Sequence, residues 1–301
     1  MSNVSDIADR GRPVSKTGNG AKGHYSIADE IHVDIDASQI NKNVRVDLPI
    51  VADAAKVLRE FLHFWKTQRR KVDRDALAAW WKEIEAWRSR ACLNFRNSET
   101  LIKPQFAIDR LYALTRGRDV YITTEVGQHQ MWAAQRFKFE EPHRWMTSGG
   151  LGTMGYGLPA AVGVQVAHPD ALVIDIAGEA SVQMTMQEMS TAVQHRLPIK
   201  VFILNNKYMG MVRQWQQFFY GNRYAESYMD ALPDFTKLAE AFGHVGMKVE
   251  RPGDVEGALT EAFKLKDRLV FLDMITDQAE NVFPMVPGGK GLTEMILAEE
   301  L

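Results

Sequence analysis

The sequence predicts an α/β protein with a doubly wound parallel sheet, preceded by a smaller, partial α/β domain. Residues 171–177, 199–204 and 269–275 are apolar runs of strand length without polar alternation, as expected for strands buried on both faces. Segments with apolar residues at helical spacing separate these runs. An alternation of buried strands and helices is typical of a parallel sheet covered by helices on both sides.

The elements of the smaller portion come first. Residues 1–29 are polar, Gly-rich and aperiodic, which indicates a loop or tail. Residues 30–36 alternate at period two and predict a strand, and residues 44–48 predict a second strand that ends at Pro49. A helix is expected from Asp53 to Trp65. Asp75 is expected to cap another helix, which carries Leu77, Trp80, Trp81, Ile84 and Trp87. A tryptophan stripe could stack a cofactor, but it more often serves packing.

The larger portion begins near residue 93. We expect helices at 102–114, 158–168, 183–195, 234–242 and 255–263, and strands at 120–123, 171–177, 199–204 and 269–275. The chain is therefore divided into a tail at 1–29, a smaller portion with a helical linker at 30–92, and a larger domain at 93–301.

Composition excludes several classes of function. The formal net charge of −2 gives no electrostatic reason to expect a nucleic-acid partner. No run of about 18 apolar residues suits a membrane span, and the first twenty residues have no apolar segment of a secretory signal. The single cysteine, Cys92, excludes an internal disulfide framework and is expected to be a small buried or half-buried residue rather than a nucleophile. The expected location is the cytoplasm.

Polar residues follow two neighbouring predicted strands. Gly178-Glu179-Ala180-Ser181 comes after the first, and Asn205-Asn206-Lys207-Tyr208-Met209-Gly210 comes after the second. Ligands of open α/β sheets bind outside the carboxyl ends of the strands, and carboxylate, amide and carbonyl oxygens suit Mg²⁺. A helix expected to start near Gln183 would point its N–H groups at an anion there. Each piece alone suits an ordinary turn, but together they favour a metal-bridged diphosphate site.

Two further segments extend this candidate site. Residues 148–157 contain five glycines in ten residues, which permits close approach of the backbone to a phosphate. Gln128-His129-Gln130 lies after an earlier strand and offers donors to the same edge. For His129 the structural and functional interpretations are equally supported.

These motifs resemble one family. Gly178-Glu179-Ala180 followed by Asn205-Asn206 resembles the thiamine diphosphate motif that begins Gly-Asp-Gly and ends Asn-Asn. GQHQMWAAQ at 127–135, SGGLGTMGYGLPAA at 148–161 and ILNNKYMGMVRQWQQ at 203–217 look like acetolactate (acetohydroxyacid) synthase catalytic subunits. EIHVDIDASQINKNVRVDLPIVAD at 30–53 is similar to the end of the central, FAD-binding domain of that family.

The resemblance implies a thiamine diphosphate-binding fold and a transferase reaction. Members of the family decarboxylate pyruvate and condense the two-carbon unit with pyruvate or 2-ketobutyrate, in the biosynthesis of valine, leucine and isoleucine. The implied cofactors are thiamine diphosphate, Mg²⁺ and FAD, which takes no part in redox turnover. The implied partners are a second copy of the chain, an N-terminal half or full subunit, and a small regulatory subunit.

The resemblance also assigns residues to roles. Mg²⁺ would be held by Glu179, Asn206 and the carbonyl of Tyr208. The diphosphate would be lined by Gln128, His129, Gly152, Ala180, Ser181 and Met209, and Met154 would wedge between the cofactor rings. Substrate or its access channel would contact Met211, Val212, Trp215 and Phe219, and FAD would contact Asp34, Ile35, Asp53 and Ala54.

The sequence departs from the family pattern in two ways. Glu179 replaces the usual aspartate and Ala180 the following glycine, so Mg²⁺ is expected to bind, though more weakly. The glutamate that activates the cofactor belongs to an N-terminal domain that the sequence does not match. No catalytic residue is therefore assigned, and the chain alone is expected to show at most trace activity. The alternatives are a non-catalytic assembly module or another thiamine diphosphate-dependent decarboxylase.

Overall fold

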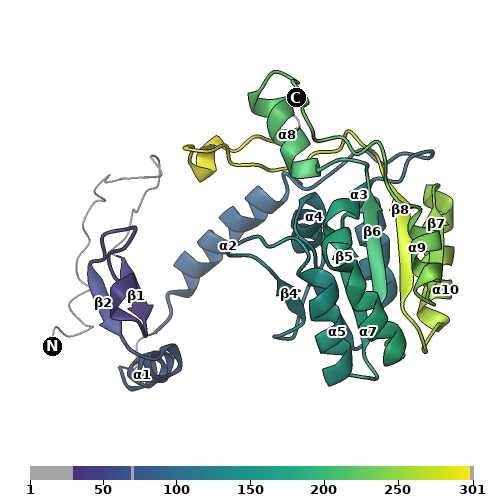
Figure 1. Ribbon diagram of the computed structural model, residues 1–301. Coiled ribbons are helices and arrows are strands. Elements are labelled where there is room, and N and C mark those ends of the chain that lie inside the picture. The colour runs from purple at the N-terminus through teal and green to yellow at the C-terminus, as the bar shows by residue number, and fades with distance from the viewer. Residues whose placement is uncertain (1–29, 69–70, 299–301) are drawn as a thin grey trace. The chain divides into compact units, whose positions relative to one another are not determined.

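The computed structural model describes residues 30–68 and 71–298, so the predicted tail at 1–29 lies outside the described residues. The chain divides into two compact units (Figure 1). The larger unit comprises residues 95–282. The smaller unit comprises residues 30–94 together with 283–298, within the described range.

The larger unit is built on a six-stranded, wholly parallel sheet. Its strands are β3 (Val120–Thr124), β4 (Trp145–Thr147), β5 (Leu172–Ala177), β6 (Lys200–Asn205), β7 (Val245–Val249) and β8 (Val270–Ile275). Their order across the sheet is β4-β3-β5-β6-β8-β7. After β3 the chain continues to β4 on one side and then crosses back to β5 on the other side of β3. This reversal opens a crevice at the carboxyl ends of β3 and β5, where such sheets bind ligands.

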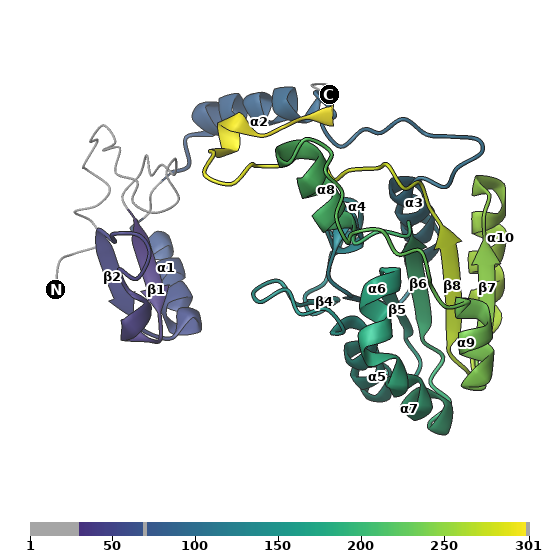
Figure 2. The same cartoon turned by 45° about the horizontal axis from the view of Figure 1, so that its top comes forward.

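Helices cover both faces of this sheet (Figure 2). One core contains side chains of α3 (Pro104–Thr115), α4 (Gln128–Arg136) and α10 (Val255–Lys264). The other contains side chains of α5 (Gly157–Ala167), α7 (Met189–Gln194) and α9 (Phe235–Ala241). Strand β5 supplies Ile174 to the first core and Val173 to the second, because successive residues of a strand point to opposite faces. The predicted doubly wound fold is thus confirmed.

The predicted helix at 183–195 is wrong as a single element. Helix α6 (Glu179–Val182) begins directly after Gly178, a 3₁₀ segment follows at Gln183–Glu188, and only then does α7 start. Thr185 leaves helical geometry with φ −134° and ψ 23°. Its hydroxyl donates to the carbonyl oxygen of Gly155 at 3.1 Å. We attribute the break to this contact with the glycine-rich loop, which sequence periodicity does not contain.

Helix α8 (Gly210–Phe219), helix α4 and the strands β4 and β7 of the larger unit were not expected from the sequence. β4 has only three residues, and β7 lies at the sheet edge and contains Gly246 and Lys248. Neither strand forms an apolar run long enough to stand out.

The smaller unit holds two parallel strands, β1 (Ile31–Asp34) and β2 (Leu48–Val51), and two helices, α1 (Ala54–Thr67) and α2 (Arg74–Arg88). The prediction that Pro49 ends the second strand is wrong, because Pro49 lies within β2 opposite His32. A two-stranded sheet consists of edge strands, where proline is tolerated. The cap of α2 is Asp73 rather than Asp75, since the carboxylate of Asp73 accepts the N–H of Asp75 and of Ala76.

Two further expectations for the smaller unit are wrong. No residue of α2 is buried, and Trp80, Trp81 and Trp87 are about half exposed. The tryptophan stripe is therefore not core packing within the described residues, although the rings of Trp80 and Trp87 meet edge-on at 5.4 Å. Cys92 is exposed rather than buried. No helix in the described part of the chain is long and apolar enough to cross a membrane.

Candidate cofactor site

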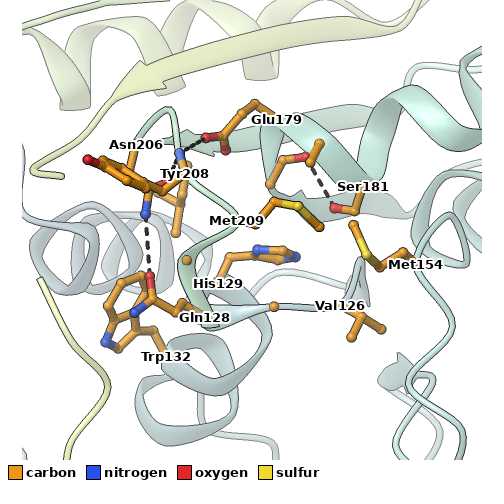
Figure 3. Close-up of a pocket in the computed structure, with 15 residues that line it drawn as sticks. Val126, Gln128, His129, Trp132, Met154, Glu179, Ser181, Asn206, Tyr208 and Met209 are labelled. Carbon is orange, nitrogen blue, oxygen red and sulfur yellow. Dashed lines mark hydrogen bonds between the residues drawn. The ribbon is translucent and has the colours of Figure 1, made fainter. Parts of the chain in front are cut away.

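A pocket opens at the carboxyl edge of the sheet, where β3, β5 and β6 end (Figure 3). It holds about 370 Å³ of space outside protein atoms, part of which is open solvent. The segments after β3, β5 and β6 contribute most of its lining, and the glycine-rich loop adds one residue. The lining residues are Val126, Gly127, Gln128, His129, Trp132, Met154, Gly178, Glu179, Ala180, Ser181, Leu204, Asn206, Tyr208, Met209 and Gly210.

A carboxylate and an amide oxygen meet on one side of this pocket. The backbone N–H of Tyr208 donates both to Oε1 of Glu179, at 3.0 Å, and to Oδ1 of Asn206, at 2.9 Å. Glu179 is 2% exposed and Asn206 is 6% exposed. Burial raises the pKa of Glu179 to about 8, against backbone hydrogen bonds that lower it and with Asp273 adding to the rise.

This donor set fits a hard cation. A positive charge beside a buried carboxyl group stabilises its charged form. Mg²⁺ and Ca²⁺ bind oxygen ligands of this kind. No group of three His, Cys, Asp or Glu side chains suited to a metal occurs among the described residues. The site can thus hold a cation only with help from neutral oxygens, such as those of Asn206 and the backbone.

His129 is clamped between two glycines. An added Cβ on Gly127 would lie 2.8 Å from Cε1 of His129, and one on Gly178 would lie 2.8 Å from both Cε1 and Nδ1. The ring fits here because neither neighbour has a side chain. Burial lowers the pKa of His129 to about 3, opposed by a hydrogen bond with the backbone of Glu125. Its Nε2 is buried without a partner in the described structure, as suits an atom that meets a ligand.

Glu125 anchors the glycine-rich loop. Its carboxylate accepts the N–H of Gly155 at 2.6 Å and the N–H of Leu158 at 3.1 Å. Gly155 has φ +86°, a backbone conformation that favours glycine. These bonds hold the loop so that Met154 lines the pocket (Figure 3). Burial raises the pKa of Glu125, against the hydrogen bonds from the loop.

The structure gathers nine of the ten cofactor residues expected from sequence around this one pocket. Gly152 is the exception: it is exposed, has φ +67° and does not line the pocket. Ser181 lies inside, buried, with its hydroxyl donating to the carbonyl of Gly178 at 3.2 Å. The lining residues to which the sequence assigned no role are Val126, Gly127, Trp132, Gly178, Leu204 and Gly210. All of these except Val126 belong to the quoted motifs, which was the available signal.

The four residues expected at the substrate all lie on α8, and none of them lines the pocket. Met211 is half-buried and packs against the first core. Val212, Trp215 and Phe219 are 42%, 49% and 42% exposed, and the Trp215 and Phe219 rings meet edge-on at 5.9 Å. These three residues form an exposed apolar face of the helix.

The residues expected at FAD lie in the smaller unit, at the carboxyl ends of its two strands. Asp34 ends β1 and accepts the N–H of Asp36 at 2.8 Å. Asp53 follows β2 and caps α1 by accepting the N–H of Lys56 at 3.0 Å, and Ala54 is the first residue of that helix. Ile35 is 74% exposed. Both aspartates therefore also serve local backbone structure.

Known proteins match both the pocket and the chain around it. The family described as "Thiamine pyrophosphate enzyme, C-terminal TPP binding domain" matches residues 125–274. The acetolactate synthase large subunit of Haemophilus influenzae is 45% identical over 284 residues, 94% of this chain and 49% of the relative. The acetolactate synthase isozyme 3 large subunit of Escherichia coli is 46% identical over 286 residues, 94% of this chain and 50% of the relative.

The acetolactate synthase large subunit of Porphyra purpurea is 44% identical over 270 residues, 89% of this chain and 45% of the relative. The chain thus spans about half the length of these curated relatives. The resemblance inferred from the motifs is confirmed. Residues 125–274 match the thiamine pyrophosphate enzyme C-terminal domain family, and the chain is similar to acetolactate synthase large subunits over about half of their length.

Proposed function

We propose that this chain carries the thiamine diphosphate and Mg²⁺ site of an acetolactate synthase catalytic subunit. In this function pyruvate is decarboxylated and its two-carbon unit is joined to pyruvate or 2-ketobutyrate. The observation that supports it best is the meeting of Glu179, Asn206 and Tyr208 with His129 and Met154 around one pocket. Homology to proteins named acetolactate synthase large subunits supports the choice of reaction.

Nine of the fifteen pocket residues have a role in this proposal. Glu179, Asn206 and the carbonyl of Tyr208 would hold Mg²⁺. Gln128, His129, Ala180, Ser181 and Met209 would face the diphosphate, and Met154 would pack against the cofactor rings. Bound thiamine diphosphate supplies the electron sink for decarboxylation, while the protein binds and orients it.

A bound anion would change the protonation state of His129. At neutral pH its ring is uncharged, because burial holds its pKa near 3. A diphosphate oxygen facing the buried Nε2 would favour the protonated ring and raise this pKa. His129 would then donate a charge-assisted hydrogen bond.

The exposed face of α8 supports the proposed substrate contacts. Trp215, Val212 and Phe219 present an apolar surface on the helix that follows the pocket segment ending at Gly210. An apolar contact with one extra methylene is worth about 1–3 kcal/mol. We propose that Trp215 uses such a contact to favour the larger acceptor, 2-ketobutyrate, with Met211 bordering the same substrate.

FAD binding and assembly belong to the same proposal. FAD would contact Asp34, Ile35, Asp53 and Ala54 at the strand ends of the smaller unit, which a flavin absorbance titration tests. The relatives are named large subunits, and we propose that this chain also works in an assembly, with a second copy, an N-terminal half or full subunit, or a regulatory subunit. Light scattering of the purified chain measures whether it self-associates.

Calorimetric titration of thiamine diphosphate in the presence of Mg²⁺ tests the site. The wild-type chain is expected to bind, and Glu179→Gln, which keeps the side-chain size but removes the charge, is expected to lose Mg²⁺-dependent binding. Glu188→Gln is the matched control, because Glu188 lies in the following segment, contacts Thr191 and does not line the pocket. Absence of binding to the wild-type chain, or equal binding by Glu179→Gln, would overturn the assignment. An acetolactate assay with pyruvate then tests the reaction.

A further inference from the structure

We propose that Gln214 on α8 is a positioning residue that fixes the orientation of the Asn206 amide through Gln128. This inference rests on the proposed function, in which the oxygen of Asn206 meets Mg²⁺. The three side chains form an amide relay from helix α8 to the pocket, and they are 0%, 3% and 6% exposed for Gln214, Gln128 and Asn206.

The backbone of Val282 fixes the first amide. The N–H of Val282 donates to Oε1 of Gln214 at 2.8 Å, and Nε2 of Gln214 donates to the carbonyl of Val282 at 3.0 Å. A backbone N–H can only donate and a carbonyl can only accept. In a flipped Gln214 amide, the NH₂ group would face the N–H of Val282 and the oxygen would face its carbonyl. The two hydrogen-bond partners therefore fix the orientation of this amide.

The second amide takes its orientation from the first. Nε2 of Gln128 donates to Oε1 of Gln214 at 2.8 Å and to the backbone carbonyl of Glu280 at 3.2 Å. Both partners are acceptors, so the nitrogen of Gln128 must face them and its oxygen must face Asn206. The side chain reaches this place because residue 210 is glycine: an added Cβ there would lie 2.1 Å from Oε1 of Gln128.

The third amide completes the relay. Nδ2 of Asn206 donates to Oε1 of Gln128 at 3.3 Å, so its oxygen turns the other way (Figure 3). That oxygen accepts the N–H of Tyr208, which also donates to Glu179. The Tyr208 N–H is a donor only, so the orientation required at this end agrees with the one set by Val282. The relay therefore holds the Asn206 oxygen on the side of Glu179.

Burial stabilises this orientation. A buried polar group left without a partner is destabilising, and hydrogen bonds strengthen at low local dielectric. Partners that orient a metal ligand typically contribute about 10–100-fold to metal affinity. The relay also connects the cation side of the pocket to the helix that carries Met211 and Trp215.

Replacing Gln214 by methionine tests the relay, because Gln214→Met keeps the length of the side chain and removes both polar atoms. The control is Gln165→Met. Gln165 is also buried and donates to the backbone carbonyls of His168, Pro169 and Ala171, but it lies on α5 and does not line the pocket. Urea denaturation confirms that each variant is folded before binding is compared.

Two readouts separate the relay from the proposed function. In the chain without Mg²⁺, the carboxamide NMR signals of Asn206, identified by their loss in Asn206→Asp, are expected to move in Gln214→Met and to stay in place in Gln165→Met. With thiamine diphosphate present, Mg²⁺ is expected to bind about 10–100-fold more weakly to Gln214→Met alone.

If the Asn206 signals stay in place in folded Gln214→Met, the relay is wrong, whatever the Mg²⁺ affinity of this variant. Moved signals with unchanged Mg²⁺ affinity would overturn the positioning role. A wild-type chain that binds no Mg²⁺ would overturn the proposed function and that role with it, while the NMR signals would still decide whether the relay exists.

Discussion

Gly178→Ala places one methyl group against the ring of His129. The backbone at Gly178 has φ −105° and ψ 156°, which alanine adopts without strain. The added Cβ would lie 2.8 Å from Cε1 and Nδ1 of His129, which is 0.6 Å short of the 3.4 Å at which ordinary contact begins. The ring cannot move away from residue 178 without a further contact, because Gly127 also lies close to Cε1.

The expected cost follows from these contacts. Overpacking of a buried site typically costs about 1–3 kcal/mol. Alanine recovers about 0.4–1 kcal/mol, because it restricts the unfolded chain more than glycine does. At the middle of both ranges the net loss of stability is about 1 kcal/mol, which lowers Tm by about 2–4 °C for a unit of this size. Thiamine diphosphate affinity should fall as well, because the displaced ring is part of the proposed diphosphate contact.

Urea denaturation followed by circular dichroism measures the change in the free energy of unfolding. Gly163→Ala is the control, since Gly163 lies within α5 and an added Cβ there meets nothing within 4 Å. Alanine inside a helix is expected to stabilise by about 0.5–1 kcal/mol. The two substitutions should thus have opposite signs. Equal stabilisation by both would refute the packing of His129 described above.

Three pH-dependent predictions follow from the buried ionisable groups. Because the pKa of Glu179 is about 8, Mg²⁺ must displace a proton below that pH. Its affinity, measured by calorimetry in two buffers, should rise roughly tenfold per pH unit from pH 6 to 8 and then level; a flat profile contradicts this. Burial lowers the pKa of Lys200 to about 7, so the unfolded chain binds one more proton between pH 7 and 10 and stability rises there. Lys200→Met should abolish that rise in urea midpoints at pH 7 and 9.5. Burial, then the charge of Glu125, raises the pKa of Asp175 well above 3.8, so the folded protein keeps a proton that the unfolded chain loses and stability falls as pH increases. Asp175→Asn should flatten this fall in Tm between pH 5 and 8, and an unchanged slope would contradict it.

Strands that are buried on both faces were predictable, because their residues must be apolar in sequence. Every residue of β5 and of β6 is buried, and both strands were expected within a residue or two. Strand β7 shows the opposite case. Its Gly246 packs so closely against α9 that an added Cβ would lie 2.3 Å from Cα of Thr236. That glycine weakens the strand signal for a reason that exists only in the folded structure.

The exact ends of helices could not be predicted where the sequence offers more than one suitable cap residue. Asp73 and Asp75 are both good N-cap residues, and only the observed bonds from Asp75 and Ala76 show that Asp73 is the cap. Helix α8 was missed because Val212, Trp215 and Phe219 form an apolar face that points away from the core rather than into it. The amphipathic pattern was present, but it did not indicate burial.

The residues that line the pocket were more predictable than the helices because they follow strands. Glu179 and Asn206 come directly after β5 and β6, and neighbouring parallel strands end at the same edge of the sheet. Trp132 on α4 and Leu204 on β6 line the pocket, and although both belong to quoted motifs, the sequence assigned them no role. Gly152 was assigned on a motif that places glycines near phosphate, and in the structure it is exposed and does not line the pocket.

The choice among four buried carboxyl groups of the described residues shows why Glu179 is the proposed metal ligand. Glu125, Asp175, Glu179 and Asp273 are buried, and burial raises the pKa of each. Asp273 accepts a hydrogen bond from the side-chain amide of Asn205. The N–H groups of the glycine-rich loop occupy Glu125. Asp175 is covered by the first turn of α5, where a Cβ on Gly157 would lie 2.2 Å from its Oδ1. Only Glu179 lines the pocket. A divalent ion in the pocket would therefore offset the burial of the Glu179 carboxylate, whereas the other three carboxyl groups do not line the pocket.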